Sequence, residues 1–144
     1  MPETYSVMVC EAVGAPLVCR RRSWPKLEHP TDVVIEVCAC GVCRTDLHVV
    51  DGDLPRRAPS VVPGHEVVGR VAEVGAAIQT LAPGVRVGAA WLGFACGLCP
   101  FCRRGEENLC PNAQFHGWTC LYAYRRCGCS GARFVAWLRL RARQ

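Results

Sequence analysis

Four cysteines between residues 96 and 110 limit the fold of this chain more than any other feature. The segment CGLCPFCRRGEENLC separates them by two, two and seven residues. Four thiolates at such spacing bind either one zinc ion or an iron–sulfur cluster. A ferredoxin run closes with a gap of three residues, whereas the gap of seven found here lets a loop wrap around one ion. The spacing therefore favours zinc, with an iron–sulfur cluster as the alternative.

Length and hydropathy indicate one soluble domain. The chain has 144 residues, of which 51% are hydrophobic, enough to bury one core but few for two. Its N-terminus lacks the basic and apolar regions of a signal peptide, and no apolar run approaches the roughly 20 residues of a membrane span. We therefore expect a cytoplasmic protein without a membrane partner. The twelve cysteines would also fit a disulfide framework, but that alternative requires export.

The net charge of +5 is concentrated near the C-terminus. Six arginines and no acidic residue follow residue 119. The other 11 basic side chains are balanced by 12 acidic ones, which leaves residues 1–119 with a net charge of −1. A nucleic-acid-binding surface needs clustered positive charge, so this body is predicted to have no nucleic-acid partner.

Short β-rich runs separated by turns predict a mainly β fold. Valine, isoleucine and cysteine are dense in these runs, and glycine or proline separates them. The segment CRTDLHVV after Gly41 favours one or two helical turns. We therefore expect a β-barrel or sandwich, and the alternation in WLRLRAR near the C-terminus is consistent with an amphipathic strand. The predicted strands cover residues 5–13, 32–40, 67–74 and 85–91.

Two stretches, GVCRTDLH and PGHE, indicate a second metal site. Four protein ligands leave no open position on an ion, so a catalytic zinc needs a separate site with three ligands and a free position. Cys43 offers a thiolate and His65 an imidazole, while Asp46 and Glu66 offer carboxylates that can orient such ligands. Taken singly, Cys43 would be a core cysteine and His65 a surface histidine. Their combination favours the metal site.

From Ile35 to Thr119 the sequence resembles the zinc-dependent medium-chain alcohol dehydrogenases. The similar segments are ACGVCRTDLHVVDGDLP, PGHEVVGRVAEVG and PGVRVGAAWLGFACGLCPFCRRGEENLCPNAQFHGWT. The resemblance implies a GroES-like, partly open β-barrel at residues 1–119, with a structural-zinc lobe at residues 93–112. It also implies oxidation of a small alcohol to an aldehyde or ketone, with NAD or NADP as hydride acceptor, in a homo-oligomer.

The resemblance assigns ligands to both zinc sites. Cys43 and His65 would bind the catalytic zinc, which acts as a Lewis acid that lowers the pKa of the alcohol. Glu66 would be a neighbouring or alternate ligand, and Asp46 would orient His65. The structural zinc would be bound by Cys96, Cys99, Cys102 and Cys110.

Four further residues receive roles from the resemblance. Thr45 would hydrogen-bond the substrate hydroxyl, and His48 would pass its proton to solvent because histidine titrates near neutral pH. Arg44 would contact the pyrophosphate of the cofactor, and Trp91 would form a wall of the substrate pocket. The alternatives are structural: Thr45 as a turn cap, Arg44 as a solvated charge and Trp91 as a core residue.

Several features of the family are missing from the sequence. No G-x-G-x-x-G motif follows a strand, and the 34 residues after Cys110 are too few for a dinucleotide-binding domain. The third ligand of the catalytic zinc is a later cysteine in the family, and the context of Cys127 and Cys129 does not resemble it. We therefore expect a truncated chain that is inactive on its own. The alternative is a non-catalytic zinc-binding module that docks on a full-length homologue.

The segment at residues 120–144 departs from the family and is basic. It is rich in arginine, cysteine, alanine and glycine, a composition that a shifted reading frame in GC-rich DNA produces. We expect a frameshift near residue 120. The expectation is wrong if no single-base insertion or deletion near that codon opens a frame that encodes a nucleotide-binding domain.

Overall fold

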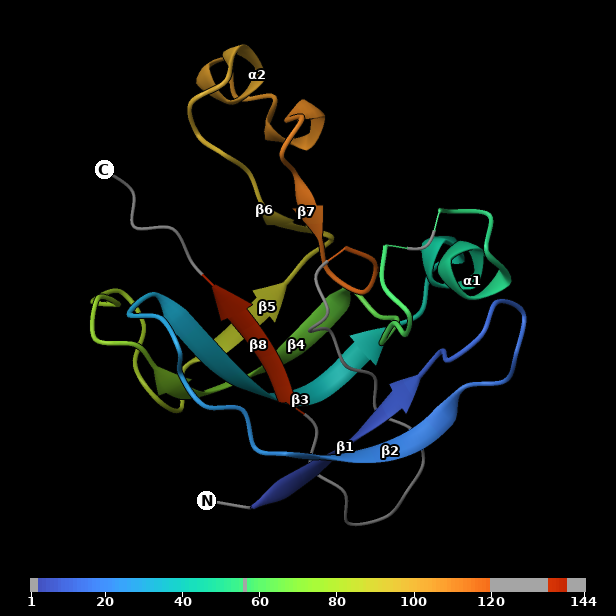
Figure 1. The fold of residues 1–144 in the computed structure, drawn as a ribbon. Coiled ribbons are helices and arrows are strands. Elements are labelled where there is room, and N and C mark those ends of the chain that lie inside the picture. Colours follow the sequence, from blue (N-terminus) through green and yellow to red (C-terminus); the bar gives the residue numbers. More distant parts are fainter. Residues whose placement is uncertain (1–2, 56, 120–134, 140–144) are drawn as a thin grey trace.

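The computed structural model describes residues 3–55, residues 57–119 and the backbone of residues 135–139. Within these residues the chain forms three antiparallel sheets and short helices (Figure 1). The main sheet has the strand order β5-β4-β3-β8, and two small sheets pair β1 with β2 and β6 with β7. The elements are β1 (Thr4–Val9), β2 (Val18–Ser23), β3 (Asp32–Gly41), α1 (Arg44–Asp51), β4 (Glu66–Val74), β5 (Arg86–Ala89), β6 (Leu92–Phe94), α2 (Pro100–Arg103), the 3-10 helix η1 (Glu107–Leu109), β7 (Gln114–Phe115) and β8 (Val135–Arg139).

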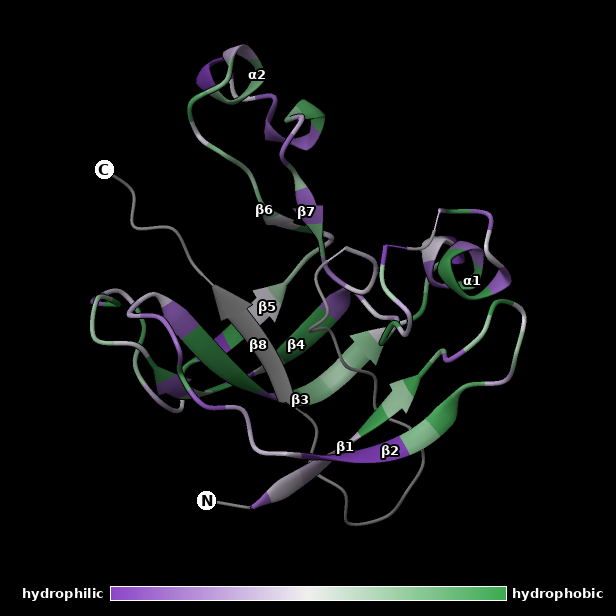
Figure 2. Ribbon diagram, viewed as in Figure 1, coloured by the Kyte–Doolittle hydropathy of each residue, from purple (hydrophilic) through white to green (hydrophobic). Residues whose placement is uncertain are grey.

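The central strand β3 carries much of the core because it pairs on both sides, with β4 and with β8. Its side chains Val33, Val34 and Ile35 are at most 1% exposed. Register shifts after Val34 and after Val37 interrupt the pairing with β4, and such irregularities increase the twist of a sheet. Figure 2 shows β3 and β4 as largely hydrophobic strands at the centre of the molecule. The mainly β, GroES-like fold is confirmed.

The structure also contains a strand that the sequence pattern does not predict. Strand β2 contains three successive arginines at residues 20–22, and its side chains are mostly exposed. Its sequence therefore lacks the alternation of apolar and polar residues that predicts a strand. Arg20 pairs with Glu11 at 2.8 Å, and Arg21 donates a hydrogen bond to Thr4. Because β2 pairs only with β1 among the described strands, its outer face stays in solvent and tolerates these charges.

Helix α1 begins with a reciprocal cap. The Cys43 sulfur accepts the backbone N–H of Thr45 at 3.3 Å, and the Asp46 carboxylate accepts the backbone N–H of Cys43 at 3.0 Å. This is a capping box in which cysteine stands where serine or threonine is usual. The helix ends before Gly52, whose φ of 86° favours glycine. Its eight residues confirm the predicted one or two turns.

Strands β6 and β7 form the base of a lobe that projects away from the main sheet (Figure 1). The lobe contains α2 and η1, with four and three residues, which are too short to be stable by themselves. Its large apolar side chains do not form a core, since Leu98 is 66% and Leu109 is 53% exposed. Hydrophobic packing therefore does not hold the lobe together.

The C-terminal expectations fall mostly on residues 120–134 and 140–144, which lie outside the described residues. The first part of WLRLRAR, residues 137–139, belongs to β8 and pairs antiparallel with β3. In the part of the chain that the structure describes, no helix is long and apolar enough to cross a membrane.

Candidate metal centres

Cys43, Asp46 and His65 meet where α1 begins and β4 is about to start. The Cys43 Sγ atom lies 3.0 Å from Nε2 of His65. The other ring nitrogen of His65, Nδ1, lies 3.1 Å from Oδ1 of Asp46. Asp46 is 3% and His65 is 5% exposed. One buried carboxylate thus connects the cap of α1 to the imidazole ring.

The donor atoms of this group suit zinc. A carboxylate only accepts hydrogen bonds, so Nδ1 of His65 donates to Asp46, and the lone pair of Nε2 faces the Cys43 sulfur. Thiolate sulfur and imidazole nitrogen are preferred zinc ligands. Tetrahedral coordination separates such a pair of atoms by about 3.5 Å. A bound ion would therefore require a small widening of the observed 3.0 Å.

We predict that Asp46→Asn weakens metal binding at Cys43 and His65 by about 10–100-fold, because the residue behind a ligating histidine fixes its tautomer and orientation. An asparagine has one acceptor oxygen, while Asp46 accepts from both His65 and the Cys43 backbone. Zinc competition with a chelator measures the affinity. Asp51→Asn, an exposed change on the same helix, is the matched control. Equal affinities for the two variants would contradict the prediction.

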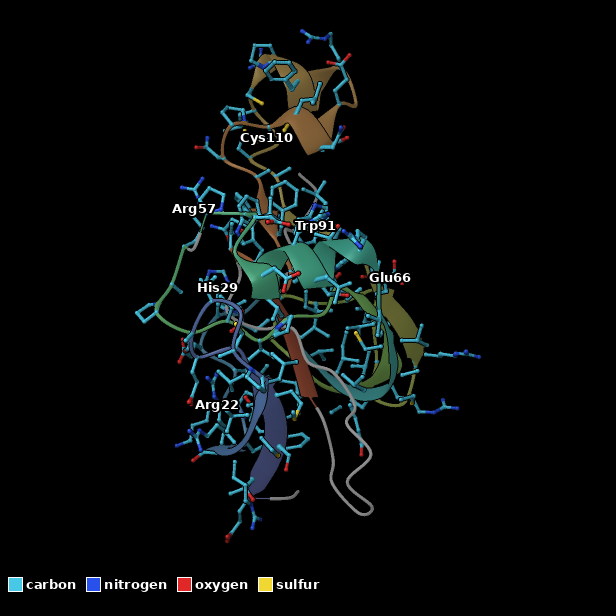
Figure 3. All side chains as sticks on the ribbon, turned by 90° about the vertical axis from the view of Figure 1, so that its right-hand side faces the viewer. Arg22, His29, Arg57, Glu66, Trp91 and Cys110 are labelled. Carbon is cyan, nitrogen blue, oxygen red and sulfur yellow. The ribbon has the colours of Figure 1, made fainter. Side chains whose placement is uncertain are left out.

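Glu66 does not join the donor group. It is exposed on β4 (Figure 3), and its carboxylate lies where a Cβ on Gly41 would be. Glu66 begins a strand directly after His65, and successive side chains in a strand point to opposite faces. A role as an alternate ligand would require this side chain to move.

The remaining predicted residues of α1 lie on the first two turns of the helix. Arg44 is exposed at the first helical position. Thr45 is half-buried, and its backbone N–H contacts the Cys43 sulfur. His48 is three residues further along, on the face of Thr45. Its Nδ1 lies 2.6 Å from Oδ2 of Asp53, a partner that the sequence pattern did not single out.

Trp91 packs against His65 of the candidate centre. Its ring centroid lies 4.7 Å from that of His65 at an interplanar angle of 67°, an edge-to-face contact. Figure 3 places Trp91 between the lobe that carries Cys110 and helix α1. An open cavity of about 680 Å³ borders both rings and is otherwise lined mostly by small apolar residues of β4 and β5. The predicted pocket residue therefore contacts both the cavity and the histidine.

An aromatic row beside Trp91 was not predicted. Trp91 stacks on Phe115 at 5.0 Å and lies nearly parallel to Trp118 at 6.0 Å. The guanidinium of Arg57 lies 5.7 Å from the centre of the Trp118 ring. The segment QFHGWT after the lobe carries these rings, but only the fold brings them next to Trp91.

The four lobe cysteines converge on one point. Their sulfur atoms all lie within 4.8 Å of one another, and those of Cys96 and Cys102 are 3.9 Å apart. Tetrahedral zinc with bonds of about 2.3 Å places its sulfur ligands about 3.8 Å apart. A cluster of several irons holds its cysteines further from one another. The geometry therefore fits a single zinc ion, as the spacing predicts.

Backbone N–H groups already point at these sulfurs. Hydrogen bonds from Leu98 and Cys99 lower the pKa of the Cys96 thiol to about 6. Desolvation, as the largest cause, raises the pKa of the Cys102 thiol to about 12. Four thiolates therefore do not form together without a cation, and zinc binding must release protons. The nine described cysteines form no disulfide.

Comparison with known proteins places this geometry in a family. The model of the alcohol dehydrogenase GroES-like domain matches residues 29–137, which ends inside β8. The chain belongs to this alcohol dehydrogenase family. It is 42% identical over 133 residues to an alcohol dehydrogenase of Rhizobium meliloti (strain 1021), and the match covers 92% of this chain and 39% of that protein.

Solved structures of alcohol dehydrogenases share the fold. A cinnamyl alcohol dehydrogenase of Sorghum bicolor superposes with a TM-score of 0.73 at 30% identity, over 94% of this chain and 38% of that one. A protein named as a zinc-binding dehydrogenase of Sinorhizobium meliloti 1021, bound to NADP, has a TM-score of 0.73 at 32% identity, over 94% and 36%. The chain spans less than two fifths of the length of each of these relatives.

Proposed function

We propose that the chain provides the zinc-binding catalytic domain of an alcohol dehydrogenase that oxidises alcohols to aldehydes or ketones with NAD or NADP. The observation that carries the proposal is the Cys43–His65–Asp46 group, in which one buried carboxylate positions an imidazole lone pair toward a thiol. A thiol and an imidazole that face each other at 3.0 Å, with the histidine tautomer fixed, are pre-arranged ligands.

The residues of the site would have different roles in zinc binding and in proton transfer. Cys43 and His65 would hold the zinc, which when bound supplies the positive charge that makes an alcohol proton easier to remove. The Thr45 hydroxyl would accept that proton and pass it on to His48, one helical turn away. Because Nδ1 of His48 is held by Asp53, its Nε2 is the atom that takes up the proton.

The outer parts of the site fit cofactor and substrate. Arg44 is exposed at the start of α1, where a guanidinium can reach the pyrophosphate of a dinucleotide. Trp91 and the open cavity beside it offer an apolar wall for the carbon chain of the alcohol. The same proposal requires three further features. These are a nucleotide-binding fold, a third ligand for the catalytic zinc, and assembly into a homo-oligomer.

The domain boundary and the location in the cell are also part of this proposal. The sequence predicts that the GroES-like domain ends at residue 119, but β8 at residues 135–139 pairs with β3 and the family match runs to residue 137, so the proposed domain includes this strand. Free thiols and zinc-bound thiolates persist in a reducing compartment, which supports the cytoplasm. The described contacts give no support to the alternative of a non-catalytic module that docks on a homologue.

A fusion tests the function. The full chain is joined to the nucleotide-binding part of the Rhizobium meliloti relative, and alcohol-dependent formation of NADH or NADPH is measured. We expect activity that Thr45→Val, which keeps the shape but lacks the hydroxyl, lowers by about 100-fold or more, while Thr45→Ser retains most of it. A fusion that binds zinc and the dinucleotide yet oxidises no primary or secondary alcohol would contradict the proposal.

A further inference from the structure

His116 is a buried histidine to which neither the sequence pattern nor the proposed function gives a task. It is 8% exposed and follows β7 at the base of the lobe. Its Nδ1 lies 2.6 Å from the carbonyl oxygen of Ala90. Because a carbonyl only accepts, Nδ1 carries the hydrogen, and burial lowers the pKa of this imidazole so that it stays neutral near pH 7.

The same residue makes a second bond to the neighbouring peptide unit. Its backbone N–H donates to the carbonyl oxygen of Trp91 at 2.9 Å. His116 therefore holds two successive carbonyls, those of Ala90 and Trp91, with two different donors. These two peptide units lead out of β5 and carry the Trp91 ring. Two hydrogen bonds from one residue fix both the position and the direction of this short connection.

Two glycine contacts show that this arrangement is closely packed. A Cβ on Gly93 would lie 2.7 Å from Nε2 of His116, so the imidazole occupies space that a side chain at residue 93 would fill. A Cβ on Gly117 would lie 2.6 Å from the carbonyl oxygen of Gly64, the residue before His65. The segment at residues 116–117 thus supports Trp91 on one side and the loop that carries His65 on the other.

We propose that His116 is a positioning residue for the Cys43–His65 centre and acts through Trp91. By holding the carbonyls of residues 90 and 91, it keeps the Trp91 ring in edge-to-face contact with His65, at 4.7 Å between centroids. Its importance for metal binding rests on the proposed function, whereas the Trp91–His65 contact can be measured without metal at Cys43 and His65.

A matched pair of substitutions isolates the side-chain hydrogen bond. In His116→Asn the amide nitrogen lies as many bonds from the backbone as Nδ1 and can donate to Ala90. In His116→Leu a methyl group of similar size takes that place and leaves the buried carbonyl without this donor. Gly93→Ala is an independent third variant, because it leaves residue 116 unchanged and displaces the imidazole by contact.

The first readout is the NMR signal of the His65 ring protons in the full chain with zinc in the lobe and no metal at Cys43 and His65. The Trp91 ring changes the chemical shifts of these protons, and the Trp91→Leu variant gives their chemical shifts without that ring. We expect His116→Leu and Gly93→Ala to move the signals most of the way to the Trp91→Leu position, and His116→Asn to restore them. Unchanged signals in both His116→Leu and Gly93→Ala, with dispersed backbone spectra, would overturn the proposal.

The second readout is zinc affinity at Cys43 and His65, with the lobe already loaded. We expect zinc affinity to fall about 10-fold in His116→Leu and by less than about 3-fold in His116→Asn. Equal affinities in wild type and His116→Leu would overturn the role in metal binding. Failure of the wild-type chain to bind this zinc would instead count against the proposed function, and the ring signals would still decide whether His116 holds Trp91.

Discussion

Replacing Cys110 by serine is expected to unfold the lobe while leaving the main sheet intact. The lobe has no hydrophobic core, and its helical segments of four and three residues cannot persist alone. Zinc binding to four thiolates supplies on the order of 10 kcal/mol in small zinc domains, which is more than enough to order such a loop. Cys110 is the most buried of the four lobe cysteines, at 5% exposed, and a serine hydroxyl is a poor zinc ligand.

Hydrogen exchange measures this effect residue by residue. In Cys110→Ser, amides at residues 96–110 should exchange roughly 100-fold faster or more, because local opening no longer requires loss of the metal. Amides in β3 should keep their protection. Cys19→Ser, an exposed cysteine outside both metal centres, is the matched control and should exchange like wild type. A lobe that stays protected in Cys110→Ser would show that contacts other than the metal hold it.

Replacing His65 by alanine should destabilise the metal-free domain by about 2 kcal/mol, because it leaves a buried carboxylate without one of its donors. The Asp46 side chain is 4% exposed and would keep the Cys43 N–H but lose Nδ1 of His65. Asp46→Ala should be costly for the same reason, since it leaves the histidine nitrogen unpaired. Both substitutions remove the same hydrogen bond, from Nδ1 of His65 to Asp46.

A double-mutant cycle separates that shared bond from the individual costs. Urea unfolding measures the loss of unfolding free energy in each single variant and in Asp46→Ala/His65→Ala. The loss in the double variant should be smaller than the sum of the two single losses by about 1 kcal/mol or more. Asp51→Ala combined with His65→Ala is the control pair and should be additive, because Asp51 is exposed. Additive losses for Asp46 and His65 would mean that the bond contributes nothing to stability.

That the members of both candidate centres lie close together could be predicted because the signals are local or chemical. The four lobe cysteines sit at fixed short spacings, and the structure brings their sulfurs within 4.8 Å. Cys43 and Asp46 are three residues apart at the start of a helix, the spacing of a capping box. His65 joins them from 22 residues away, and its pairing with Cys43 followed from the chemistry of zinc ligands together with the family resemblance.

The parts that the sequence did not predict depend on contacts between distant segments. His116 acts on a carbonyl 26 residues away, and a carbonyl leaves no mark in the sequence. Strand β2 could not be recognised in the sequence because it carries charged side chains that only an exposed edge strand tolerates. Glu66 follows His65 directly in the sequence, yet the alternation of strand residues turns it away from the donor group.

A zinc titration monitored by native mass spectrometry tests most directly the claim that this domain carries two separate zinc centres. The wild-type chain should bind one ion tightly and a second more weakly. Cys43→Ser, in which serine still caps α1, should lose only the second ion, and Cys110→Ser should lose the tight one. A wild-type chain that binds a single ion, or a second ion that Cys43→Ser leaves unchanged, would contradict the claim.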